Sequence, residues 1–336
     1  MDPYGRGAVV GAVAGALYGL MVYLWLHHLN GDVGVMVASY LFVVPFVLGL
    51  ISGAWLPTEK PRKEDGPDAF GTTGGGRSEV WPVLGVAAVT VTVFLVTALV
   101  LGFEGVLCAF LAAPVMYLVA LPGALLGFGL RRWRGRAGAV LFAAALPALL
   151  GPLEQARPLP NIYRTVSNDV LIQAPPEAVW RQIRSVPRIE DREIHAGWAH
   201  LIGLPRPREA ILNHDGVGAA RIATFDGGLT FLETVTDWEE GRTLAFRIQA
   251  RDPGGLDPHV RVGGRFFDVL SGRYELEEVS PGITLLHLTS TQRVSTHFNG
   301  YTAFFTQAIM RDLQRTILEV IRDRAEGRGA GVVAGR

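Results

Sequence analysis

Long apolar runs alternate with short polar connections over the first 154 residues, and this pattern predicts a membrane-spanning helical block. A helix needs about 20 mostly apolar residues to cross the hydrocarbon core of a bilayer. We expect five such helices, at 8–26, 33–55, 81–101, 106–130 and 137–153. The fifth run is short and contains Pro147 and Pro152. A re-entrant or interfacial segment is therefore the alternative interpretation of that run.

Lys and Arg residues cluster in two of the connections, and this asymmetry predicts an orientation. One cluster lies at 60–77 and the other at 131–136, whereas the connections near Asn30 and Glu104 carry none. Since Lys and Arg favour the cytoplasmic side of short loops, we expect a cytoplasmic N-terminus and a cytoplasmic loop at 57–80. Five spans then place the C-terminal region outside the cytoplasm. We interpret the chain as an integral protein of a bacterial plasma (inner) membrane.

Gly11, Gly15 and Gly19 form a face of small residues on the first predicted helix. Such faces let helix backbones approach closely. Packing within the block is one interpretation, and homo-oligomerisation through these three glycines is the other. No Asp, Glu, Lys or Arg lies in the middle of any run, although pumps and proton-coupled transporters depend on such residues. We therefore expect an anchor or scaffold, residues 1–154, rather than a transporter.

The hydrophobic period changes after residues 155–162, which contain prolines and are expected to form a linker. A strand at 165–173 is followed by two short helices, the first beginning near Pro176 and the second covering 189–198. One long amphipathic helix is predicted over 299–324, where apolar residues follow helical spacing. Residues 327–336 are expected to be a flexible tail. Between the short helices and the long helix, strands are predicted at 209–213, 219–225, 230–238, 243–251, 265–270, 273–278 and 284–294.

Three motifs support a family resemblance that covers residues 163–326. VLIQAPPEAVW at 170–180 is similar to an opening strand that runs into a Pro-Glu-x-Val-Trp helix. GVG at 216–218 precedes Arg221, and ETVTDWEEGR at 233–242 resembles a Glu-x-Val hairpin. Together with the element order, they resemble the START-like helix-grip superfamily (SRPBCC), which includes polyketide cyclase/dehydrase and lipid-transport domains. The expected fold class is therefore an all-α transmembrane bundle followed by an α+β helix-grip domain.

The resemblance implies an antiparallel sheet that wraps around the last helix and encloses a hydrophobic cavity for an apolar ligand. Polar residues that alternate along the predicted strands could instead form a solvated outer face. His287, Thr289, Thr291 and Arg293 share one such face and must lie on the same side. The residues that we expect to line the cavity are Trp198, Arg221, Phe231, Phe246, Arg265, Phe267, Thr289, Thr291, Tyr301, Phe305 and Ile309.

The leading functional hypothesis is a membrane-anchored domain that binds a lipid, isoprenoid or polyketide-like ligand for presentation, sequestration or transfer at the bilayer. The alternatives are a membrane sensor of such a ligand, or a cyclase or dehydratase that uses Glu233 or Asp312 together with His287. The 31 basic and 31 acidic residues balance, so nothing favours nucleic acid as a partner. With Cys108 as the only cysteine and no HExxH motif, we expect no metal site and no cofactor.

Overall fold

The computed structural model describes residues 3–30, 36–56, 80–131, 133, 135–195, 197–252 and 260–328. The chain divides into two compact units, Met1–Pro158 and Leu159–Arg336. Residues 57–79 of the expected cytoplasmic loop and all but the first two residues of the expected tail lie outside the described residues. Each unit is therefore considered by itself.

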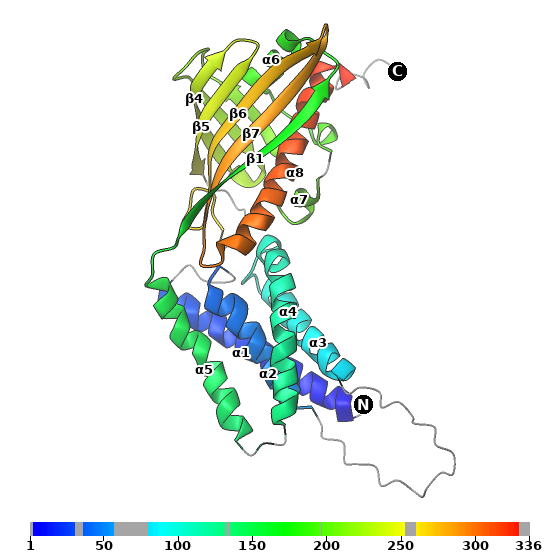
Figure 1. Ribbon diagram of the computed structural model, residues 1–336, viewed down its shortest axis with the longest axis vertical. Helices are drawn as coiled ribbons and strands as arrows, with labels where there is room; N and C mark the ends of the chain where they lie inside the picture. Colours follow the sequence, from blue (N-terminus) through cyan, green and yellow to red (C-terminus); the bar gives the residue numbers. More distant parts are fainter. Residues whose placement is uncertain are drawn as a thin grey trace, which may run out of the picture. The chain divides into compact units, whose positions relative to one another are not determined.

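The N-terminal unit is helical, as the apolar runs predict (Figure 1). By length and composition, three of its described helices can cross a membrane, and their apolar segments are Val80–Val100, Val106–Leu130 and Ala137–Glu154. The apolar segments Val9–Trp25 and Ser39–Ala54 are shorter. The fifth run is one continuous helix despite its two prolines. The helices are α1 (Pro3–Asn30), η1 (Ser39–Val43), α2 (Val44–Ala54), α3 (Val80–Val100), α4 (Val106–Leu130) and α5 (Arg136–Gln155).

Glycines allow α2 and α4 to pack with their backbones in direct contact. A Cβ atom at Gly49 would lie 2.0 Å from the carbonyl oxygen of Ala120, and one at Gly123 would lie 2.1 Å from that of Phe46. The predicted small-residue face of α1 is also occupied within the chain, because Gly11 lies against Ser52 and Gly19 against the ring of Phe94. These glycines therefore serve packing inside the unit, and homo-oligomerisation through them stays a prediction.

The carboxylate of Glu154, near the end of α5, accepts hydrogen bonds from the backbone nitrogens of Ala38 (2.6 Å) and Ser39 (2.8 Å). The first backbone N–H groups of a helix have no partner within the helix. A carboxylate there satisfies them and complements the positive end of the helix dipole. Glu154 thus ties α5 to the start of the segment formed by η1 and α2.

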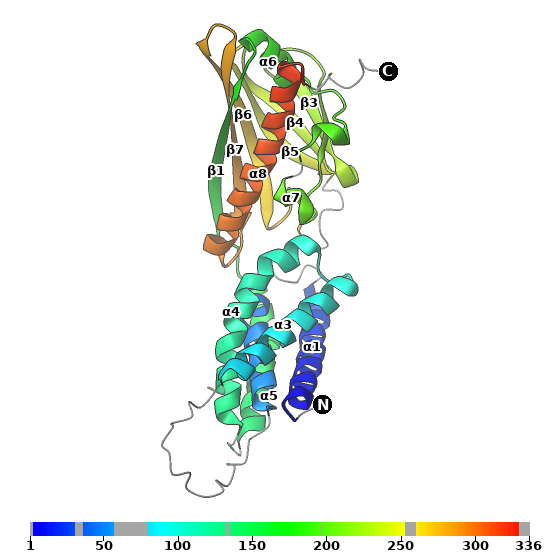
Figure 2. The same cartoon turned by 90° about the vertical axis from the view of Figure 1, so that its right-hand side faces the viewer.

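The C-terminal unit is a seven-stranded antiparallel sheet with one long helix along its inner face (Figures 1 and 2). The strand order is β1-β7-β6-β5-β4-β3-β2. The helix is α8 (Asn299–Ala325), and α6 (Pro176–Arg184), η2 (Asp191–Glu193), α7 (Trp198–Leu201) and η3 (Asp226–Gly228) are short. The strands are β1 (Asn161–Ile172), β2 (Pro207–Leu212), β3 (Ala220–Phe225), β4 (Thr230–Glu239), β5 (Thr243–Asp252), β6 (Phe267–Ser280) and β7 (Ile283–Ser295). The expected α+β helix-grip fold is confirmed.

Two local expectations are wrong. The strands predicted at 265–270 and 273–278 are one strand, β6, because Gly272 does not form a turn. Instead, the pairing with β7 shifts between Val269 and Ser271, which is a β-bulge. The helix predicted at 189–198 is replaced by the single turn η2, closed by a capping box between Glu190 and Glu193, and by the separate helix α7.

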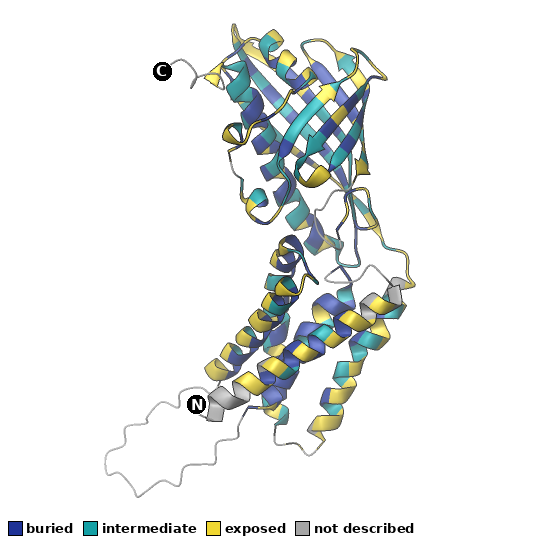
Figure 3. Cartoon of the chain, turned by 180° about the vertical axis from the view of Figure 1, so that it is seen from behind, coloured by how far each residue is buried: buried dark blue, intermediate teal, exposed yellow. Residues whose placement is uncertain are grey.

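The core of this unit lies where α6 and the C-terminal half of α8 meet the sheet. Along β7, buried residues alternate with half-buried ones (Figure 3), as expected for a sheet with one covered face. Leu318 and Ile321 of α8 pack in one cluster with Val179 and Trp180 of α6 and with inward residues of the strands. The cavity lies beside this core, along α8 toward its N-terminus.

Candidate functional site

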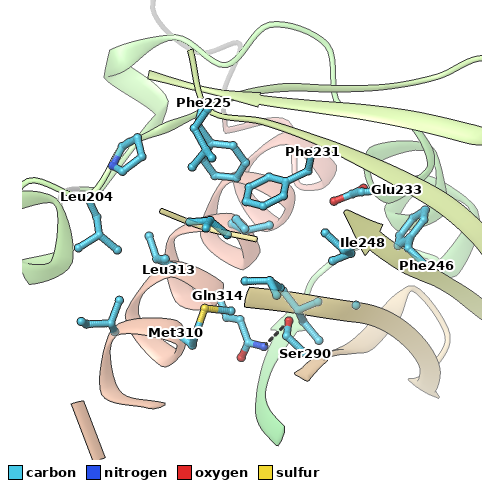
Figure 4. Close-up of a pocket in the computed structure, with 18 of the residues that line it drawn as sticks. Leu204, Phe225, Phe231, Glu233, Phe246, Ile248, Ser290, Met310, Leu313 and Gln314 are labelled. Carbon is cyan, nitrogen blue, oxygen red and sulfur yellow. Dashed lines mark hydrogen bonds between the residues drawn. The ribbon is translucent and has the colours of Figure 1, made fainter. Parts of the chain in front are cut away.

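A cavity of about 160 Å³ lies between the sheet and α8 (Figure 4). Its wall on the sheet side is rich in aromatic residues, namely Phe225, Phe231, Phe246, Phe267 and Tyr274. Its wall on the helix side consists of residues spaced along one face of α8, namely Ile309, Met310, Leu313, Gln314 and Ile317. Leu204, which follows α7, lies at the opposite end of the cavity from Phe246 in Figure 4.

A buried ion pair lies inside this apolar cavity. The Nε atom of Arg221 on β3 donates to Oε2 of Glu233 on β4 at 2.5 Å, and the two residues are directly paired across the strands. Arg221 is 5% exposed and Glu233 is 7% exposed. Both side chains point inward. Successive strand residues point to opposite faces, and Arg221 shares the inner face with Ala223 on β3, as Glu233 does with Phe231 on β4.

Three further contacts fix the guanidinium group of Arg221. Its Nη1 atom donates to the carbonyl oxygen of Ile183 at 2.6 Å. Its Cζ atom lies 4.1 Å from the ring centroid of Phe246 and 5.9 Å from that of Tyr274, an arrangement typical of cation–π attraction. Burial lowers the pKa of Arg221, but the charge and hydrogen bond of Glu233 together with the hydrogen-bonded Tyr274 phenol outweigh burial, so the pKa lies above its usual value. Arg221 therefore stays charged, and its charge is balanced by Glu233.

Tyr274 and Ser290 add hydroxyl groups to the cavity wall. Burial raises the pKa of the Tyr274 phenol, against the opposing effect of Arg221, so the phenol remains neutral at physiological pH. The Oγ atom of Ser290 accepts a hydrogen bond from Nε2 of Gln314 at 2.9 Å (Figure 4). Gln314 also donates to the carbonyl oxygen of Val166 and accepts from Asn168. These bonds hold Gln314 in place and leave the Ser290 hydroxyl hydrogen for another acceptor.

Six of the residues predicted for the site line this cavity. They are Arg221, Phe231, Glu233, Phe246, Phe267 and Ile309. The sequence reasoning missed Tyr274, Ser290 and Gln314. Alternation could have indicated two of them, because Tyr274 shares a face with Leu276, and Ser290 with Leu286 and Leu288.

The polar residues predicted on the last strand lie on the outer face of the sheet. Thr289 hydrogen-bonds Ser167 on β1 at 3.0 Å and Thr291 hydrogen-bonds Thr165 at 3.3 Å. His287 contacts Asp169 at 3.3 Å on the same face. Since successive strand residues point to opposite faces, these side chains face away from the cavity that Leu288 and Ser290 line. The structure therefore does not bring His287 together with Glu233.

The other candidates also lie outside the cavity wall. Asp312 is buried on α8, where its Oδ2 atom accepts from the backbone nitrogen of Ala199 at 2.9 Å. Its carboxylate thus holds the N-terminus of α7, which carries Trp198. The rings of Tyr301 and Phe305 pack against each other in the first turns of α8, with centroids 4.9 Å apart and planes tilted by 57°. Arg265 precedes β6, and its carbonyl oxygen accepts from Arg293.

Within the described parts of the chain, no three His, Cys, Asp or Glu side chains gather in a way that could hold a metal ion.

The sequence model of the family described as polyketide cyclase/dehydrase and lipid transport matches residues 163–326. This match confirms the family resemblance of the C-terminal half. No curated protein matches the chain in sequence.

Solved structures that resemble the chain cover mainly one half of it. The Zhui aromatase/cyclase from Streptomyces sp. R1128 is 15% identical, with a TM-score of 0.33, and the match covers 52% of this chain and 100% of that one. An uncharacterized protein from Rhizobium leguminosarum is 14% identical, with a TM-score of 0.32, and the match covers 50% of this chain and 97% of that one. The di-domain aromatase/cyclase BexL from the BE-7585A biosynthetic pathway is 16% identical, with a TM-score of 0.32 and 61% of each chain covered.

Proposed function

From the premise that residues 163–326 form a polyketide cyclase/dehydrase-like helix-grip domain, we propose that this chain is a membrane-anchored binder of an apolar ligand. The ligand would occupy the cavity between the sheet and α8, for presentation, sequestration or transfer at the bilayer. One observation carries the proposal. The cavity is apolar over most of its wall, and its two charged groups, Arg221 and Glu233, neutralise each other.

The size and lining of the cavity support binding of a hydrophobic group. An engineered cavity of about 150 Å³ lined by Leu, Ile and Phe stays dry and binds benzene. The present cavity is of similar size and is lined by several Phe rings and by aliphatic residues of α8. An aromatic or isoprenoid group therefore fits it. Arg221, Tyr274 and Ser290 would orient the polar part of such a ligand, as a few polar groups do in other apolar sites.

Binding is favoured over acid–base catalysis by the placement of the ionisable residues. No histidine is among the described residues that line the cavity. Asp312 is engaged with Ala199, and Glu233 is held by Arg221. A cyclase or dehydratase remains the second candidate, because the hydroxyl groups of Tyr274 and Ser290 line the same cavity as Arg221. Conversion of a poly-β-keto substrate that is lost in Tyr274→Phe would favour that candidate.

The membrane part of the proposal rests on the helices of the first unit and on exposed residues of the second. Three helices are long and apolar enough to span a bilayer. In the second unit, Leu201 of α7 is 78% exposed and Phe304 of α8 is 68% exposed. Asn299, the first residue of α8, donates to the carbonyl oxygen of Pro160 at 2.6 Å. Phe304, five residues after Asn299 on the same helix, therefore lies near the point where the chain enters this domain from α5.

We extend the proposal to lipid contact by Leu201 and Phe304. Five residues, 156–160, connect α5 to β1, and a connection of this length reaches roughly 20 Å at most. Exposed Leu and Phe side chains of a domain held by so short a connection would be able to enter a lipid surface. On the basis of the Lys and Arg distribution, we further propose that the domain lies outside the cytoplasm. Alkaline phosphatase fused after Arg336 should then be active.

The binding proposal can be tested by filling the cavity. Gly272 of β6 lines it, and a Cβ atom there would meet only Ile248, at 3.4 Å. Gly272→Leu should thus be accommodated while occupying ligand space. The full chain in phosphatidylcholine nanodiscs should increase the fluorescence of N-phenyl-1-naphthylamine above that of empty nanodiscs, and Gly272→Leu should abolish this increase. An equal increase in the folded Gly272→Leu variant would refute binding in this cavity.

A further inference from the structure

A second, smaller hollow of about 80 Å³ also borders the Arg221–Glu233 pair. It is formed by the segment that follows α6, by β2 and β3, and by the C-terminal half of α8. Its own apolar lining includes Val186, Ala210, Ala223, Val320 and Ile321. It shares five residues with the main cavity, namely Arg221, Phe225, Glu233, Tyr274 and Ile317.

The shared residues place the polar groups between two apolar spaces rather than at the end of one. Arg221, Glu233 and Tyr274 are each at most 7% exposed. A ligand that filled only the main cavity would have its polar group at one end. A ligand that filled both hollows would have its polar group in the middle, with an apolar group on each side.

The charges around the Arg221–Glu233 pair disfavour an anionic ligand. Glu233 already neutralises Arg221, and Glu209 of β2 lines the smaller hollow as a further acidic residue. A ligand carboxylate would compete with Glu233 for Arg221 and leave one buried charge without a partner, which is costly. A neutral carbonyl or hydroxyl oxygen carries no such cost. It can accept from a remaining guanidinium N–H group, since Arg has five and the contacts to Glu233, Ile183 and Tyr274 use three.

We propose that the two hollows form a single site for an uncharged ligand with a hydrogen-bonding oxygen in its middle and apolar groups at both ends. The larger apolar group occupies the main cavity, and the smaller one lies among Val186, Val320 and Ile321. The oxygen lies at Arg221 and Tyr274. This inference rests on the proposed binding function and names the class of ligand.

Three related probes separate the elements of this inference. Benzylideneacetone has one phenyl ring and little beyond its carbonyl group, chalcone adds a second ring beyond the carbonyl, and cinnamate ends in a carboxylate. Binding to the full chain in phosphatidylcholine nanodiscs would be measured by equilibrium dialysis near neutral pH, with empty nanodiscs as the reference. Chalcone should bind at least about tenfold more tightly than benzylideneacetone, since its second ring is buried, and cinnamate should bind most weakly.

Substitutions that fill only the smaller hollow provide the decisive comparison. Ala223 and Ala210 line it and do not line the main cavity. Ala223→Leu, or Ala210→Leu if the first variant does not fold, should weaken chalcone by about tenfold, the loss expected when one ring is no longer buried. Benzylideneacetone should be nearly unaffected. Ala220→Leu is the matched control. Ala220 is on the same strand, but it points to the outer face of the sheet, whereas Arg221 and Ala223 point inward.

Each result decides between defined outcomes. An equal loss for chalcone and benzylideneacetone, or no loss of chalcone in either folded variant, would overturn the two-hollow site while leaving the main cavity as a binding site. Cinnamate binding as tight as that of benzylideneacetone would overturn the preference for uncharged ligands. If none of the probes binds the parent chain, the proposed function fails together with this inference.

Discussion

Arg221 and Glu233 form a hydrogen-bonded ion pair at 2.5 Å inside a cavity whose other walls are mostly apolar. Removing two charges from water is expensive, and a buried pair is often no more stabilising than apolar residues of similar volume. The pair is therefore poorly explained as a stabilising device alone. Its position at the boundary of two hollows favours a role in orienting a ligand.

Stability and binding should be separable at this pair. Arg221→Met alone should destabilise the domain by about 3–5 kcal/mol, because it leaves the Glu233 carboxylate buried without a partner. The double change Arg221→Met, Glu233→Leu should recover most of that loss, as measured by chemical denaturation. Binding of benzylideneacetone should nevertheless stay weakened in the double variant. Parental affinity in that variant would assign the pair to structure only.

Replacing large side chains of α8 by Ala should cost less stability at the cavity than in the packed core. Leu318 is 2% exposed within the main core cluster, so Leu318→Ala should cost about 3 kcal/mol or more. Ile309 lines the cavity, where its neighbours are already loosely packed, so Ile309→Ala should cost clearly less and should change probe uptake. Thermal unfolding and dialysis would measure both effects. Equal stability losses with unchanged uptake would mean that Ile309 packs in a full core.

The sequence was sufficient for the architecture because the relevant signals are periodic. Apolar runs of membrane-spanning length and the single amphipathic helix at the C-terminus are long patterns that tertiary contacts rarely override. The end of the first strand and the helix after Pro175 followed from proline chemistry, whereas the strand begins at Asn161 rather than at the expected residue 165. The two strands expected around Gly272 could not be recognised as one, since a bulge and a turn both favour glycine.

The candidate site was predicted less completely, because alternation identifies two faces without saying which one is covered. On β7, the polar set Thr289, Thr291 and Arg293 is conspicuous in the sequence, yet the covered face is that of Leu288 and Ser290. The sequence was equally ambiguous about whether Arg221 points into the cavity or to solvent. Arg221 lies inside because Glu233 is its direct neighbour on the next strand, and that register is set by the whole sheet.

A second ion pair predicts how the domain responds to acid. Arg324, near the end of α8, binds both carboxylate oxygens of Glu193 at 2.7 and 2.9 Å and also donates to the carbonyl oxygens of Pro187 and Arg188. The hydrogen bonds from Arg324 are the main cause that lowers the pKa of Glu193. A lowered folded-state pKa means that the stabilisation is present above the ordinary Glu pKa of about 4.3 and is lost as the pH falls through the folded value.

Arg324→Met should therefore destabilise the domain by about 2 kcal/mol at neutral pH. This difference from the parent should stay constant down to about pH 5 and shrink below about pH 4. Thermal unfolding over a pH series would measure it. Arg242→Met is the control, since the Arg242–Glu239 pair is exposed and should contribute less than about 0.5 kcal/mol. A difference that grows on acidification would contradict the assignment.

Lipid contact should depend on the exposed apolar residues of α7 and α8. Trp198→Glu together with Leu201→Glu should reduce association of residues 159–336 with phosphatidylcholine liposomes, because charged residues disfavour the apolar interface. Uptake of an apolar fluorescent probe from vesicles should slow more than uptake from dilute solution. Val217→Glu is a suitable control, since Val217 is also an exposed apolar residue but lies in the loop before β3. If both uptake rates fall equally, the proposed contact is wrong.

If the proposed function is right, the cavity holds an apolar molecule while the helical unit anchors the chain in a membrane. Native mass spectrometry of the full chain, released from nanodiscs, measures this most directly when the parent is compared with Gly272→Leu and with Ala220→Leu. An apolar molecule should remain bound to the parent and to Ala220→Leu, and it should be absent from Gly272→Leu, whose cavity is filled. The same bound molecule at the same occupancy in Gly272→Leu would show that the molecule is not held in this cavity.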